Sequence, residues 1–435
     1  MSTINPDVSP WRLFSRFSLV LLVFILWMLA QLVVPIKFIP YSLLSKIEIL
    51  KMLIPAIGIV VCTLLYVDKV ILTGKVKAFY LFGAFCLMKS WILFFTFPTT
   101  LGYFINSVMY TLWVLIMFII APSIFNSLSK IRTFLRCMIV TFSIVAVICL
   151  WFVAYFGIDV ELLYREGRLT FVYGNPLYLG GVAYSIICCS LMLIELSKST
   201  VERILLYLLL VVCFWVILES YSRTFMAGVF VLLVVYLFNK LVHSRGILVL
   251  LTLACSTSFI FVYLFQIINS ESLSANALNS LSSGRVGNWS LAFQQSMDGL
   301  NVLWGGDGTS NYVKSLGTAD GDSVDATFQR YSIDNTYIEI FINSGLIGIS
   351  LFLWGLVSIF RMISLSSLRK TKDGENLIGI LSISYAIFTS VVVSGFFYGH
   401  YPSLGNTINA AVLPAVLSVI FLVNRHTIAS KKGNY

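Results

Sequence analysis

Acidic and imidazole side chains stand at the ends of apolar runs in the last third of the chain. The stretch "DNTYIEIFINSGLIG", residues 334–348, begins with Asp334 and includes Glu339 before it becomes apolar. A carboxylate there is suited to cap a helix by accepting backbone N–H bonds, or to remove a proton from a substrate hydroxyl. His400, in "YGHYPSLGN", is an alternative base or an interfacial residue. These residues are the candidate acid–base groups.

Arginines supply the candidate anion-binding groups. Arg223 follows Glu219 in the tight connection "LESYSRTFMAG", where an ion pair with Glu219 or snorkelling to lipid headgroups competes with anion binding. A guanidinium stays charged and offers paired donors to phosphate oxygens, such as those of a lipid diphosphate. Arg285, in "SSGRVGNW", opens an amphipathic stretch, and a helix N-terminus also favours an anion. Arg165 and Arg168 are either solvated or add to the same positive charge.

The elements that position these residues are membrane helices. The 435-residue chain is 59% hydrophobic and only 11% charged, about half the charged share of a soluble domain. Runs of roughly 18 to 23 apolar residues recur along it, each long enough to span a bilayer as a helix, and the alternation of barrel strands is absent. We therefore expect an all-α, polytopic membrane protein of about twelve transmembrane helices, at 17–36, 47–67, 78–97, 101–121, 134–156, 176–196, 203–219, 224–241, 246–268, 336–360, 377–398 and 404–423.

The distribution of charge predicts the orientation of these helices. The net charge is +10, and most of the 29 basic residues fall in alternate connections that would share one side of the membrane. The positive-inside rule then places both termini in the cytoplasm. The positive charge is thereby explained without nucleic acid. All eight cysteines fall within predicted spans, which indicates core packing rather than disulfides or a cysteine-based metal site.

One long polar segment divides the chain into three parts: 1–268 with nine spans, the loop 269–335, and 336–435 with three spans. The sequence "DGDSVD", residues 320–325, has oxygen ligands at alternate positions but no glutamate at the twelfth position of a calcium loop, so we expect a solvated segment and no metal. Apolar residues spaced along one helical face predict an amphipathic helix in the same loop, and these residues are Val286, Trp289, Phe293, Met297 and Leu300.

Four of these stretches, in their order along the chain, resemble motifs of the O-antigen ligase and O-antigen polymerase superfamily of bacterial surface-polysaccharide assembly. "YGNPLYLGG", residues 173–181, is similar to its Asn-Pro-x-x-x-Gly segment, and "SRTFMAG" to its Ser-Arg-(Thr/Gly) turn. "SGRVGNW" is similar to its (Ser/Gly)-Gly-Arg-x-x-x-Trp helix start, and "DNTYIEIFINSGLIG" to its (His/Asp)-Asn-x-Tyr segment, which ends in Gly-Leu-(Leu/Ile)-Gly. The resemblance covers roughly residues 170–355.

The resemblance implies a membrane-embedded, metal-independent glycosyltransferase without a cofactor. Its donor would be an oligosaccharide on undecaprenyl diphosphate, used at the periplasmic face of the bacterial inner membrane. By this resemblance Arg223 and Arg285 contact the donor diphosphate, and the large loop after the ninth span is periplasmic. We further expect substrate contacts from polar residues of the matched motifs, namely Asn335, Tyr337, Asn175 and Tyr173.

Asp334 stands where the ligases of this superfamily carry a histidine. An acidic residue there is more typical of Wzy-type polymerases, which join lipid-linked repeat units to one another, so we expect a polysaccharide polymerase that works with a chain-length regulator. A ligase that transfers the chain to lipid A core is the alternative within the superfamily. A transporter of lipid-linked oligosaccharides is the alternative from another class, and Lys89, inside the third predicted span, is the residue that would favour it.

Overall fold

The structure is a computed structural model that describes eleven stretches of the chain. They are residues 16–33, 56–61, 74–96, 101–158, 160–165, 167–173, 175–241, 301–305, 335–366, 377–395 and 406–432. Helices make up nearly all of them. The strands within these residues are β1 (Tyr164–Arg165) and β2 (Arg168–Leu169), which form one short antiparallel hairpin.

The α-helices follow the apolar runs of the sequence. Two of the runs contain π-helical turns, at Ile116–Ile120 and Ile408–Val412, and single 3₁₀ turns cover Gly74–Val76, Val160–Leu163 and Phe171–Tyr173. The α-helices are α1 (Arg16–Val33), α3 (Lys77–Thr96), α4 (Leu101–Leu115), α5 (Ala121–Ile124), α6 (Leu128–Tyr155), α7 (Pro176–Leu196), α8 (Thr200–Glu219), α9 (Arg223–Leu241), α13 (Asn301–Trp304), α14 (Thr336–Ser366), α15 (Leu377–Ser394) and α16 (Leu413–Lys432).

The prediction of an all-α, multi-pass membrane protein is confirmed by the helices that the structure describes. Six of their stretches are long and apolar enough to cross a bilayer, and three shorter apolar helices accompany them. The total of twelve spans stays a prediction, because span 246–268 and most of span 47–67 lie outside the described residues. The six long stretches are Ser107–Ile124, Leu128–Tyr155, Pro176–Leu196, Thr200–Glu219, Thr336–Ile363 and Ile408–Arg425.

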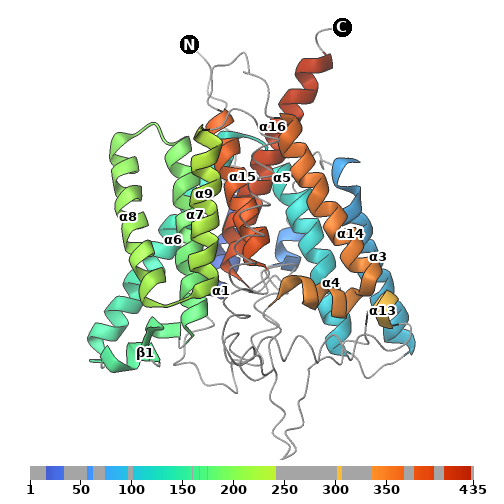
Figure 1. Cartoon of the computed structure of the whole chain (residues 1–435). Coiled ribbons are helices and arrows are strands. Elements are labelled where there is room, and N and C mark those ends of the chain that lie inside the picture. Colours follow the sequence, from blue (N-terminus) through green and yellow to red (C-terminus); the bar gives the residue numbers. More distant parts are fainter. Residues whose placement is uncertain are drawn as a thin grey trace, which may run out of the picture.

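The helices are arranged around a central pair, α15 and α16 (Figure 1). The α16 stretch is 94% buried inside the protein, whereas the α8 stretch is only 22% buried and the α6 stretch 28%. The outer helices α6 and α8 therefore present apolar side chains to the surroundings, as expected of helices that face lipid. Helices α3, α4 and α14 lie on the other side of the central pair (Figure 1).

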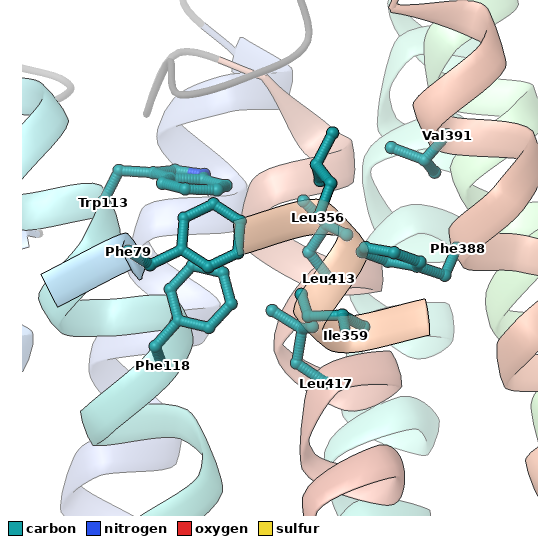
Figure 2. Close-up of a pocket in the computed structure, with 9 residues that line it drawn as sticks. All are labelled: Phe79, Trp113, Phe118, Leu356, Ile359, Phe388, Val391, Leu413 and Leu417. Carbon is teal, nitrogen blue, oxygen red and sulfur yellow. The ribbon is translucent and has the colours of Figure 1, made fainter. Parts of the chain in front are cut away.

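Aromatic side chains fill the contact between α3, the first π-helical turn and α14. The Phe79 ring stacks on Phe118 with centroids 4.1 Å apart, and Phe352 meets Phe79 edge-on at 5.6 Å. Beside them lies a small apolar hollow (Figure 2), and the one polar group in its lining, the indole N–H of Trp113, donates to Asn409 Oδ1 at 2.9 Å. The hollow is a packing feature of the core. Its lining residues are Phe79, Trp113, Phe118, Leu356, Ile359, Phe388, Val391, Leu413 and Leu417.

Glycines allow α7, α9 and α15 to approach closely, as small residues do in membrane bundles. A Cβ atom on Gly180 of α7 would lie 2.8 Å from Ser222 Cβ, just before α9 begins. Further along α9, the carbonyl of Gly228 accepts a hydrogen bond from Ser390 Oγ of α15, and Tyr184 Oη of α7 donates to the same Ser390 Oγ at 2.6 Å. These contacts fix the position at which α9 begins.

We predict that Gly180→Ala lowers the free energy of unfolding of the purified protein by about 1–3 kcal/mol. The added methyl group would collide with the Ser222 side chain and the Phe225 ring, which have little room to move. Gly74→Ala is the matched control, since its new Cβ would meet only the flexible end of Lys77, at 3.4 Å. The measurement is thermal unfolding in detergent. Equal stability of the two variants would contradict the close approach of α7 and α9.

Candidate functional site

The candidate site lies at one end of the helical bundle, the lower end in Figure 1. The β1–β2 hairpin, the turn between α8 and α9, helix α13 and the beginning of α14 all lie at this end. Among them are the elements that carry Arg165, Arg168 and Arg223 and the start of the Asp-Asn segment. The bundle therefore brings to one end the described parts of three of the four motif regions, whereas the "SGRVGNW" stretch lies outside the described residues.

Arg168 holds the turn between α8 and α9. Its Nε donates to the carbonyl of Ser220 at 3.2 Å, and its Nη2 donates to the carbonyl of Tyr221 at 3.1 Å. These carbonyls follow the last residue of α8, where unpaired acceptors and the negative end of the helix dipole favour a cation. The sequence predicted Arg168 as a diphosphate contact, but the structure places two of its donors on the backbone of the turn.

The hairpin that carries Arg168 is closed by local hydrogen bonds. Arg165 pairs with Arg168 across the two strands. The backbone N–H of Thr170 donates to the carbonyl of Leu163 at 2.9 Å, and Thr170 Oγ1 donates to the same carbonyl at 3.0 Å. The hairpin thus fixes the backbone from which the Arg168 side chain reaches the turn. The side chain of Arg165 lies outside the described residues.

The turn contains a strained residue, Tyr221. Its φ is 46°, in the left-handed region that costs an ordinary L-residue about 1–2 kcal/mol. Its backbone N–H donates to the carbonyl of Leu218 at 3.0 Å, and its side chain is 61% exposed. Backbone strain of this kind concentrates at functional sites when the surroundings enforce it, and here Arg168 bonds the carbonyl of the strained residue. No residue-type pattern in the sequence indicated this strain.

Helix α9 begins at Arg223, directly after the strained residue and Ser222. The carbonyl of Ser222 accepts from the N–H groups of Phe225 at 3.0 Å and Met226 at 2.9 Å. Its hydroxyl is buried and has no hydrogen-bond partner among the described residues. The Arg223 side chain is exposed at the positive end of the α9 dipole. Two sources of positive charge therefore coincide at the start of α9.

The beginning of α14 is capped by Asn335. Its Oδ1 accepts from the N–H groups of Tyr337 at 2.9 Å and Ile338 at 3.0 Å, and its side chain is buried. The sequence placed this capping role at or near Asp334, which lies outside the described residues. The backbone N–H of Glu339 donates to the carbonyl of Asn335 at 3.0 Å, which closes the first turn, and the Glu339 side chain is half-buried. Asn335, predicted to contact substrate, has an identified structural role.

The end of α15 connects the two halves of the site. Gly395, just after α15, accepts from the N–H of Thr336 at 2.8 Å, while Tyr337 Oη donates to the carbonyl of Val392 at 2.7 Å. Ser390, five residues before Gly395, contacts Gly228, and Gly228 lies five residues after Arg223. The start of α9 and the start of α14 therefore both lie near the end of α15, at the same end of the bundle (Figure 1).

Asn175 and Tyr173, the other predicted substrate contacts, lie at the start of α7. Asn175 caps this helix by accepting from the N–H of Leu177 at 2.9 Å, and its side chain is exposed. The Tyr173 ring is buried against Tyr178, with centroids 5.1 Å apart. Burial, with a smaller contribution from Cys149, raises the pKa of the Tyr173 phenol above its ordinary range. Tyr173 therefore stays protonated and neutral at physiological pH.

Three predicted site residues, Arg285, Asp334 and His400, lie outside the described residues, as do the predicted amphipathic helix 286–300 and the acidic segment 320–325. Within the described stretches no group of three or more His, Cys, Asp or Glu residues is placed to hold a metal ion. The cysteines of these stretches are free thiols, namely Cys86, Cys137, Cys149, Cys188, Cys189 and Cys213.

Comparison with models of known protein families and with curated protein sequences finds no match to this chain.

We predict that Arg168→Gln lowers the free energy of unfolding by about 1 kcal/mol, the contribution of a partly exposed charge-assisted contact. Tyr221→Gly should recover part of this loss in the double variant, because glycine adopts a positive φ without strain. The measurement is a double-mutant cycle of thermal unfolding. Arg168→Lys, which keeps one point charge, should fall between wild type and Arg168→Gln. Wild-type stability of Arg168→Gln would show that the turn does not depend on this guanidinium.

Proposed function

We propose that the protein is a polysaccharide polymerase, a membrane glycosyltransferase that joins oligosaccharide repeat units carried on undecaprenyl diphosphate. The proposal places it in a bacterial inner membrane, with its active face in the periplasm, both termini in the cytoplasm and a chain-length regulator as partner. The observation that carries it is the junction at the end of α15. There the strained turn that presents Arg223 and the capped start of α14, which follows Asp334, are held to the same helix end.

The charges at this junction suit the departure of a diphosphate. As the bond between the anomeric carbon and the diphosphate oxygen breaks, its electron pair stays on the diphosphate, and negative charge grows there. Arg223, at the positive end of α9, would stabilise that charge together with Arg285. Both groups are guanidiniums, which remain cationic at any physiological pH and bind phosphate oxygens through paired N–H groups.

The acceptor sugar must lose a proton as its hydroxyl oxygen bonds to the anomeric carbon. We assign this step to Asp334, which would take the proton on its carboxylate, with Glu339 and His400 as the other candidate bases. The capping bonds of Asn335 support this assignment, because with them the start of α14 does not need the Asp334 carboxylate as its cap. The products are an elongated lipid-linked chain and undecaprenyl diphosphate, with the proton on the base and the electron pair of the broken bond on the diphosphate.

We predict that Arg223→Gln and Arg285→Gln each reduce turnover about 10²–10³-fold, the cost of removing one donor to a developing anion. The assay uses the purified protein with undecaprenyl-diphosphate-linked repeat units and follows the ladder of chain lengths. Arg361→Gln is the matched control, since Arg361 is an exposed arginine of α14, 25 residues along the helix from Thr336. Full activity of both site variants would contradict the proposed diphosphate site. Transfer to lipid A core without a ladder would identify a ligase.

We predict that Asp334→Asn abolishes most turnover while leaving the thermal stability unchanged. The amide keeps the size of the side chain but cannot take a proton at neutral pH, and the cap of α14 belongs to Asn335. Asn335→Ala is the comparison, because it should lower stability by about 1 kcal/mol through loss of the cap. Unchanged turnover of Asp334→Asn would remove this carboxylate as the base.

A further inference from the structure

Lys89 is a buried cation that joins three elements. It lies on α3 and is only 4% exposed. Its Nζ donates to the carbonyl of Trp304 at the end of α13 and to the carbonyl of Asn343 in α14, the latter at 2.9 Å. Burying an ammonium group is costly unless its donors are satisfied. Here two backbone carbonyls accept hydrogen bonds from the ammonium group.

The Asn343 carbonyl is available because α14 is broken two residues later. Gly345 has φ 61° and ψ −166°, a combination that is essentially restricted to glycine. The turn before such a break has carbonyls without their usual helical partners, and the negative end of the helix dipole lies there. Lys89 therefore caps the first segment of α14, residues 336–344, at its C-terminal end. This segment lies across the lower end of the bundle, away from the direction of the rest of α14 (Figure 1).

Helix α13 is attached to the same face of α3 through Trp304. Its ring stacks on Phe85, with centroids 5.7 Å apart and an interplanar angle of 27°. Phe85 and Lys89 are four residues apart and so lie one above the other on the helix. One holds the ring of Trp304, and the other holds its carbonyl.

The backbones of α13 and α14 touch at two glycines. A Cβ on Gly345 would lie 2.3 Å from the carbonyl oxygen of Leu303, and a Cβ on Gly305 would lie 2.5 Å from the backbone nitrogen of Ser344. Gly305 itself has φ 78°. A side chain at either position would separate the two elements. Lys89 is thus the side chain that closes a joint built from close backbone contact.

We propose that Lys89 is a positioning residue for the proposed glycosyl-transfer site. By holding both α13 and the first segment of α14 on α3, it fixes the direction of the segment whose N-terminal cap, Asn335, follows Asp334. The inference rests on the proposed function. It also gives the intramembrane lysine a role other than the one a transporter would require.

The test compares Lys89→Met, which removes charge and donors, with Lys89→Arg, which retains both. The control is Lys77→Met, at the exposed first residue of α3. Hydrogen exchange followed by mass spectrometry should find residues 301–305 and 336–344 exchanging about 10-fold faster in Lys89→Met, the effect of losing one charge-assisted bond. Exchange in α7, α8 and α9 should not change. Wild-type exchange at 301–305 and 336–344 would overturn the proposed joint.

Turnover separates positioning from general destabilisation. Lys89→Met should lower kcat about 10-fold or more with little change in the KM for the donor lipid, because the turn with Arg223 does not depend on α3, and Lys89→Arg should restore most of kcat. Faster exchange with unchanged kcat would overturn the positioning role. If Lys89→Met does not fold, Lys89→Gln, which keeps an N–H donor, is measured in its place against the same criteria. If the wild-type protein transfers no sugar, the proposed function fails, while hydrogen exchange still decides whether Lys89 closes the joint.

Discussion

A backbone N–H or C=O group that is freed inside a membrane protein must find another partner, because lipid provides none. The described part of this chain meets that constraint at three places in the candidate site, namely the end of α8, the break in α14 and the start of α14. Arg168 takes the carbonyls after α8, Lys89 takes a carbonyl before the break in α14, and Asn335 takes N–H groups at its start. Gly395 accepts the N–H of Thr336. Specific hydrogen bonds thus fix the conformation of the irregular backbone at the candidate site.

The described cations of the site have two different roles. Arg168 and Lys89 are joined to backbone carbonyls and determine where turns and segments lie. Arg223 stands exposed at the start of α9 and is the described cation that we assign to the ligand. The strained backbone of Tyr221 belongs with the first role, since Arg168 donates to the carbonyl of this same residue. The proposed chemistry therefore depends on arginines and a lysine with different tasks, although the sequence presents them alike.

Composition and the length of apolar runs were sufficient to predict the helical class, because burial of the backbone in lipid leaves few alternatives. The same reasoning was insufficient at the breaks. Gly345 lies in an apolar run like many other glycines. Only its close approach to the Leu303 backbone shows why α14 is broken at this residue. The sequence predicted a cap at or near Asp334, and the structure shows the capping bonds at the next residue, Asn335, because Asp and Asn are both good caps. Arg168 was grouped with ligand-binding arginines, because its partners, Ser220 and Tyr221, lie about fifty residues away in sequence.

The most direct test is an electron cryomicroscopy structure of the protein in a lipid nanodisc with undecaprenyl diphosphate bound. We predict density for the diphosphate at the end of α15, within hydrogen-bond distance of the Arg223 guanidinium and beside the start of α14. Diphosphate density elsewhere on the protein, with Arg223 directed into the lipid, would contradict it.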